Sequence, residues 1–154
     1  MKKPLLALLA CAFTLGYIGM IQAASDTITI QQQVDLLKWQ DFPGLPGVQF
    51  VVVAGNPREA GPYTIRAKFA PGVMSRPHWH PEARYVTVLK GTWWAGEGDV
   101  LDRDKTIPVA MGGFAIHTPG KVHYDGAKDE EVIVQISGIG PSGTNPVNPA
   151  PEAK

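Results

Sequence analysis

The sequence predicts an all-β protein, built as an antiparallel sandwich or barrel. Short alternating or apolar runs recur along the chain, and turn residues separate them. The 17 glycines and 14 prolines are a high share of 154 residues, which suits a chain with many turns. The sequence contains no internal repeat and no long helical pattern. Its length allows one domain with a sizeable core.

The clearest expected strand covers residues 63–69, in which the side chains of one face are apolar and those of the other are polar. Lys90 and Gly91 separate two further strands and predict a hairpin that pairs them. The charged segment 99–105 is expected to form one helical turn. The expected strands are 27–30, 49–54, 63–69, 85–89, 92–95, 114–118 and 131–137.

The first 24 residues have the layout of a secretory signal peptide. Lys2 and Lys3 form a basic start, residues 5–21 are almost wholly apolar, and Ala23 and Ala24 offer a cleavage site. An uncleaved membrane anchor is the alternative, although the apolar run is slightly short for a span. Cleavage predicts a periplasmic or secreted mature protein with no membrane segment.

Charge and composition narrow the function classes. The chain carries 14 basic and 14 acidic residues, and loss of Lys2 and Lys3 leaves a mature net charge of about −2. This balance argues against a nucleic-acid partner and favours a small-molecule ligand. Cleavage also removes Cys11, the only cysteine, so thiolate chemistry and thiolate metal ligands are excluded. The predicted division is a signal peptide at 1–24, one domain at 25–140 and a flexible C-terminal tail at 141–154.

All four histidines fall in two clusters, which makes them candidates for a metal site. His78 and His80 lie two residues apart, so they share one face if the segment is extended. His117 and His123 follow about 40 residues later. A lone histidine is usually a packed or hydrogen-bonded residue, but this clustering favours metal binding. Imidazole ligands suit a divalent transition metal (zinc, iron, copper, nickel or manganese), and the sequence leaves its identity open.

The two clusters resemble the two motifs of the cupin superfamily, whose members are small jelly-roll β-barrels. The resemblance covers roughly residues 36–139 and implies a metal held by histidines and a possible homodimer. It implies no particular reaction, because cupins include enzymes, storage proteins and sensors. Gly72, His78, His80 and Gly91 match the spacing of the first motif, and Gly113, Gly120 and His123 match the second.

Arg84 departs from the cupin pattern, because it stands where the first motif has a glutamate ligand. A guanidinium cannot bind a metal. Glu82, two residues earlier, or His117, where cupins commonly have an apolar residue, could replace that ligand. Arg84 and Tyr85 are candidates for binding a small organic acid, with a surface arginine as the alternative. Tyr124, Asp125 and also Tyr85 are interpreted as packing and turn residues, with a supporting role at the site as the alternative.

Two functions remain open. The first is a small metal-dependent enzyme, dioxygenase-like, that acts on a small organic acid and whose catalytic residues the sequence does not identify. The second is a non-catalytic metal-binding, ligand-binding or sensing module of the bacterial envelope, in which a fourth histidine would fill the metal's coordination sphere.

Overall fold

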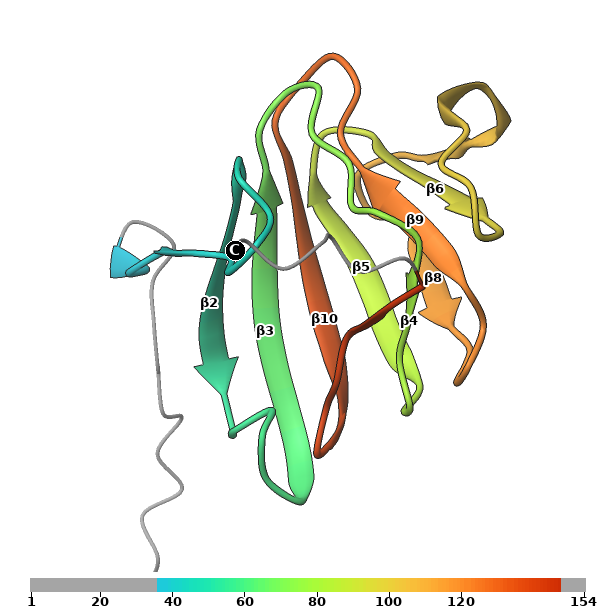
Figure 1. The fold of residues 1–154 in the computed structure, drawn as a ribbon. Coiled ribbons are helices and arrows are strands. Elements are labelled where there is room, and N and C mark those ends of the chain that lie inside the picture. The colour runs from blue at the N-terminus through green and yellow to red at the C-terminus, as the bar shows by residue number, and fades with distance from the viewer. Residues whose placement is uncertain (1–35, 148–154) are drawn as a thin grey trace, which may run out of the picture.

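The computed structural model describes residues 36–147, which form two antiparallel β-sheets (Figure 1). The six-stranded sheet has the order β1-β2-β3-β10-β5-β8, and the five-stranded sheet has the order β11-β4-β9-β6-β7. This arrangement confirms the predicted all-β jelly roll. Residues 1–35 and 148–154, which include the predicted signal peptide and the predicted strand 27–30, lie outside the described residues.

The strands are two to nine residues long. The six-stranded sheet contains β1 (Gln40–Asp41), β2 (Val48–Ala54), β3 (Gly61–Phe69), β5 (Arg84–Lys90), β8 (Phe114–His117) and β10 (Val132–Gly140). The five-stranded sheet contains β4 (His78–Trp79), β6 (Trp93–Glu97), β7 (Ile107–Val109), β9 (His123–Gly126) and β11 (Asn145–Pro146). The predicted helical turn is the 3₁₀ helix η2 (Arg103–Lys105). Within residues 36–147 the structure has no helix that is long and apolar enough to cross a membrane.

The hydrophobic core is built from the inward faces of strands of both sheets. On β5, Val86 and Val88 are 1% exposed, whereas Tyr85 between Arg84 and Val86 is 46% exposed, as the period of two requires. Trp93 of β6 packs against this core from the five-stranded sheet. The buried cluster comprises Val48, Ala67, Phe69, Val86, Val88, Trp93, Ala127, Val132, Val134 and Ile136.

The predicted hairpin at Lys90 and Gly91 is wrong. β5 pairs with β8 and β10, whereas β6 pairs with β7 and β9 in the other sheet. Gly91 has a φ of 72°, and a Cβ there would lie 2.6 Å from the backbone oxygen of Glu131. The tight turn at this glycine therefore carries the chain from one sheet to the other. A local turn signal predicts the change of direction, but not the sheet that the next strand joins.

The segment after Gly140 also differs from the prediction of a flexible tail beginning at residue 141. Asn145 and Pro146 form β11, which pairs with Trp79 and His78 of β4. Figure 1 shows this segment, in dark red, crossing from the end of β10 toward β4. Its glycine- and proline-rich composition suggests a tail, but the backbone of β4 supplies hydrogen-bond partners that the composition does not show. We call residues 141–147 the strap.

Candidate metal centre

Two histidines of the candidate site lie on β4 and directly after it, in a segment that is bracketed by prolines. Pro77 and Pro81 flank His78-Trp79-His80, and proline has no backbone donor with which to extend a ladder. The strand is therefore only two residues long, and it lies between β11 and β9. Its register places His78 directly opposite His123 of β9.

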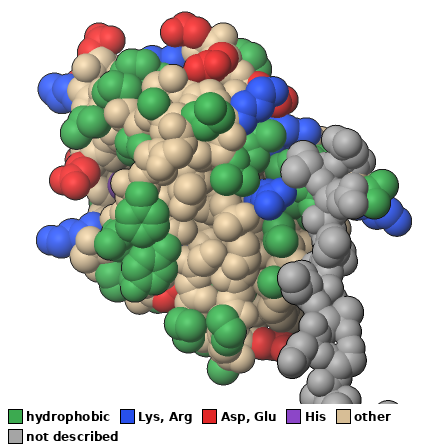
Figure 2. All heavy atoms as spheres, turned by 180° about the vertical axis from the view of Figure 1, so that it is seen from behind, with side chains coloured by type: hydrophobic (Ala, Val, Ile, Leu, Met, Phe, Trp, Pro, Cys, Tyr) green, Lys and Arg blue, Asp and Glu red, His purple; other side chains and the backbone are tan. Residues whose placement is uncertain are grey.

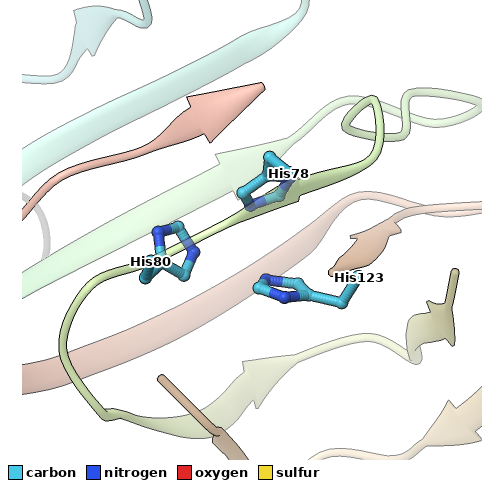
Figure 3. A group of neighbouring side chains, drawn as sticks. All are labelled: His78, His80 and His123. Carbon is cyan, nitrogen blue, oxygen red and sulfur yellow. The ribbon is translucent and has the colours of Figure 1, made fainter. Parts of the chain in front are cut away.

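The rings of His78, His80 and His123 converge. Figure 3 shows that the two imidazoles from the β4 segment and the one from β9 point toward a common space. The ring centroids are 4.8 Å apart for His78 and His80, 4.4 Å for His78 and His123, and 5.0 Å for His80 and His123. One nitrogen from each of the three rings lies within 4.8 Å of the others. The three side chains could therefore hold one metal ion.

His117 reaches the same place from the other sheet. It ends β8, where it pairs with Arg84 of β5. Its ring centroid lies 3.8 Å from that of His123 and 5.6 Å from that of His80. The structure thus brings all four predicted histidines together, with one from the six-stranded sheet and three from the five-stranded sheet and its adjoining loop.

Hydrogen bonds fix the tautomer of three of the rings. The Nδ1 atoms of His78 and His80 lie 2.7 Å from the backbone oxygens of Arg76 and Gly143. The Nδ1 atom of His123 lies 3.0 Å from the backbone oxygen of Lys121. A carbonyl oxygen only accepts, so each Nδ1 must carry the proton. Each Nε2 is then left with a free lone pair, which is the arrangement that a metal ligand needs.

Burial favours the neutral form of three of the four imidazoles, those of His80, His117 and His123. His80 is 1% exposed, and burial, followed by the nearby charge of Arg84, lowers the pKa of His80 to about 2. Burial likewise lowers the pKa of His117 to about 3 and lowers that of His123 below its ordinary value. On the face shown in Figure 2, almost no histidine surface is visible. Neutral imidazoles are the form that binds metals, so His80, His117 and His123 can accept a cation over a wide pH range.

Two of the rings also have buried nitrogens without a partner. Neither nitrogen of His117 makes a hydrogen bond among the residues described, and the same holds for Nε2 of His123. Buried polar atoms are almost always hydrogen-bonded, so unpartnered ones call for an explanation such as an ion or water. The Oδ2 atom of Asp125 lies 3.8 Å from the Nε2 atoms of both His117 and His123. This carboxylate is 5% exposed and belongs to the cluster.

Arg84 is held by the protein's own groups. Its Nε donates to Glu82 Oε1 at 2.9 Å, and one of its terminal nitrogens donates to Ser142 Oγ at 2.5 Å and to the backbone oxygen of Gly143 at 3.0 Å. The guanidinium is therefore bound to the Glu82 carboxylate and to the strap. These contacts are with polar groups of the chain itself, and binding of a substrate acid by Arg84 stays a prediction.

Glu82, the other candidate for the missing ligand, is paired with Arg84. It also accepts a hydrogen bond from Tyr63 Oη at 3.1 Å. Burial raises the pKa of the Glu82 carboxyl, but hydrogen bonds from Ser142 and Arg84 outweigh it, so that this pKa lies below its usual range. The carboxylate is ionised and already compensated by a cation.

Tyr85, the second candidate for substrate binding, lies on the opposite face of β5 from Arg84. Its ring packs beside Phe114 of β8, with the ring centroids 6.4 Å apart. Alternation along the strand sends these two neighbours in opposite directions. The structure therefore does not bring Tyr85 to the histidines.

Sequence reasoning gave too little weight to two parts of the site. Asp125 follows His123 by two residues, so the same spacing that groups His78 with His80 could have placed it on the face of His123. The strap carries no such signal. Ser142 and Gly143 contact Arg84, and Gly143 contacts His80, yet their sequence context is that of a linker.

The two antiparallel sheets form a jelly roll, and the match to a cupin-like family model makes the chain a cupin. More narrowly, residues 27–141 match the ChrR cupin-like domain family, and the chain belongs to that family. No curated protein matches the chain.

Solved structures share the fold at low sequence identity. The polyketide cyclase RemF from Streptomyces resistomycificus is 14% identical with a TM-score of 0.66, and the match covers 80% of this chain and 88% of that one. An RmlC-like cupin from Shewanella frigidimarina is 13% identical with a TM-score of 0.57, covering 73% and 91%. The DMSP lyase DddQ from Ruegeria pomeroyi is 13% identical with a TM-score of 0.55, covering 69% and 57%. These likenesses show the fold alone.

Proposed function

We propose that this protein binds one divalent transition metal ion through His78, His80, His117 and His123. The observation that carries the proposal is the set of three Nδ1 hydrogen bonds to backbone carbonyls. They turn three buried or partly buried Nε2 lone pairs toward one another. No hydrogen-bonding need of the protein itself explains this arrangement, whereas a bound cation does.

The proposed site favours transition metals over calcium and magnesium. Imidazole nitrogens are good ligands for zinc, iron, copper and nickel, whereas calcium and magnesium prefer oxygen. When bound, such a metal supplies Lewis acidity toward an oxygen atom of a small molecule. The chain contributes imidazole ligands, and the buried ring of Trp93, whose centroid lies 5.6 Å from that of His117, helps to exclude water.

Metal analysis of purified protein after dialysis tests this proposal. We expect one equivalent of zinc, iron, copper, nickel or manganese in the wild type. His78→Ala, His80→Ala and His123→Ala should lose it, while His117→Ala should bind more weakly. Asp129→Asn, an exposed change on the loop after β9, is the control and should retain the metal. A wild type that takes up none of the five metals would refute the proposal.

In its more specific form, the proposed function is that of an enzyme acting on a small organic acid. The support is the fold that the chain shares with a polyketide cyclase and a DMSP lyase. The alternative is a non-catalytic binding or sensing module. Its support is that four imidazoles lie in one cluster and can close the coordination sphere. The two forms differ in whether the metal keeps an open position.

Azide titration of the cobalt-loaded protein separates these two forms. A saturable change in the cobalt d–d absorption at modest azide concentration indicates an open position and favours the enzyme. An unchanged spectrum indicates a closed site and favours the binding module. The His117→Ala variant is the internal reference, because removing one imidazole should open a position in either case.

A further inference from the structure

We propose that Asp125 is the anionic ligand of the metal site, taking the part of the glutamate that the cupin pattern has at the position of Arg84. This inference rests on the proposed function and deepens it. It assigns a charged oxygen ligand to a site that otherwise consists of neutral nitrogens.

The backbone places Asp125 beside His123 and holds it there. Both residues lie on β9, and their spacing of two directs both side chains to the same face. The Asp125 N–H donates to Ser75 Oγ at 2.9 Å, and the Ser75 N–H donates to the Asp125 backbone oxygen at 2.7 Å. This double clamp limits the freedom of the Asp125 backbone, so its carboxylate is preorganised toward the imidazoles.

The distances suit a shared ion better than direct hydrogen bonds. Asp125 Oδ2 lies 3.8 Å from Nε2 of His117 and 3.8 Å from Nε2 of His123. Both separations exceed a hydrogen bond. Two ligand atoms 3.8 Å apart can, however, each lie about 2.0–2.2 Å from one ion between them, the usual distance for nitrogen and oxygen ligands. The ligand atoms of His117, His123 and Asp125 all lie within 4.8 Å of one another.

The charge of Asp125 requires a cation that the chain does not supply. The residue is 5% exposed, and within residues 36–147 its carboxylate has no lysine or arginine at ion-pair distance. A buried charge without a partner is costly, and buried carboxylates are therefore paired or bound to metals. A metal ion between Asp125, His117 and His123 would compensate this charge and also satisfy the unpartnered Nε2 atoms of both rings.

The pairing of Glu82 with Arg84 leaves Asp125 as the available anion. The Glu82 carboxylate lies 2.9 Å from the Arg84 guanidinium, so these two charges compensate each other. Arg84 and Glu82 therefore form a neutral unit beside the site. Of these two carboxylates, only Asp125 has no lysine or arginine of residues 36–147 at ion-pair distance.

Cobalt binding to Asp125→Asn tests the inference with readouts other than activity. We expect the dissociation constant, measured by competition with a chromophoric chelator, to rise at least tenfold, and the cobalt d–d absorption to change because one ligand changes. Asp129→Asn removes an exposed carboxylate from the loop that follows β9, four residues after Asp125, and should alter neither readout. An unchanged dissociation constant in Asp125→Asn overturns the inference. So does weaker binding with an unchanged spectrum, which would make Asp125 a positioning residue.

A second variant covers the case in which Asp125→Asn does not fold. Asp125→Cys in a Cys11→Ser background puts a single thiol in the chain. Ligation by this residue predicts a near-ultraviolet thiolate-to-cobalt charge-transfer band, and a folded, cobalt-loaded variant without that band overturns the inference. If the wild type itself takes up none of zinc, iron, copper, nickel and manganese, the proposed function fails. If the wild type binds metal and Asp125 variants are unaffected, only the present inference fails.

Discussion

Breaking the ion pair between Glu82 and Arg84 should strongly destabilise the protein. The two side chains are 12% and 10% exposed and their charged atoms lie 2.9 Å apart. Removing one member of a buried pair leaves the other charge uncompensated, at a cost of about 3–5 kcal/mol. Glu82→Gln leaves Arg84 with two neutral acceptors on the strap, Ser142 Oγ and the Gly143 oxygen. We therefore expect Glu82→Gln to lower the free energy of unfolding by about 3 kcal/mol, the low end of this range.

The companion variant Arg84→Met leaves the Glu82 carboxylate with neutral partners alone, namely the Tyr63 hydroxyl, the Gly143 N–H and Ser142. Its cost should be similar, about 3 kcal/mol. The double variant has neither charge, so its cost should fall below the sum of the single costs by about 2 kcal/mol, within the range of coupling between contacting residues. Glu131→Gln breaks an exposed pair with Lys90 and is the matched control, expected to cost less than about 1 kcal/mol.

Urea unfolding followed by tryptophan fluorescence, in the presence of a chelator, measures these free energies of unfolding without a contribution from metal. If the free energy of unfolding has the same slope against urea concentration in every variant, unfolding exposes the same amount of surface in each of them. Additive costs for the two single changes, or a Glu82→Gln cost no larger than that of Glu131→Gln, would refute the argument that burial makes this pair indispensable.

The remaining predictions concern acid stability and processing. In the metal-free protein the pKa of His80 is about 2 and that of His117 is about 3, below the ordinary value of 6.5. At a pH between the folded-state pKa and 6.5, each of these histidines is protonated in the unfolded state but not in the folded state. The free energy of unfolding should therefore fall as the pH drops below 6.5, by about 1.4 kcal/mol per pH unit for each histidine. His117→Gln should reduce the fall in the free energy of unfolding between pH 6 and pH 4 by the contribution of one histidine. Urea titrations at these two pH values measure this fall. An equal fall in the variant and the wild type would contradict the assignment of the low pKa to His117. The signal-peptide prediction implies loss of about 24 residues on export from a Gram-negative host. Intact-mass measurement of the periplasmic fraction tests this, and recovery of the full-length chain in membranes would disprove cleavage.

Local sequence patterns predicted most of the strands, and they also predicted that the four histidines lie close together. Alternation along β3 is a property of neighbouring residues, and so is the spacing of His78 and His80. The crossing at Gly91 depends instead on which strands pair across long stretches of chain, and the turn residues carry no information about that choice. Pairing decided at long range therefore limits what turn signals can predict.

The strap shows the same limit for the site. Gly143 offers its backbone oxygen to both His80 and Arg84, and a backbone group leaves no trace in residue type. Asp125 was visible in the spacing, but an aspartate in a turn-like context is common, and only its burial beside unpartnered imidazoles gives it significance. Side-chain identity can therefore reveal candidate ligands, whereas the groups that orient or neutralise them emerge from the fold.

The origin of the histidines in two different sheets has a consequence for the mechanical integrity of the barrel. An ion held by His117 on one wall and by His78, His80 and His123 on the other would act as a cross-brace between the walls. Separation of the two sheets would then require release of the ion. The free energy of unfolding would therefore rise by about 1.4 kcal/mol for each tenfold increase in the free metal concentration above the dissociation constant. Hydrogen exchange of β8 and β9 would slow together as the metal supply increased. The lifetime of the folded barrel would thus follow the metal content of its surroundings.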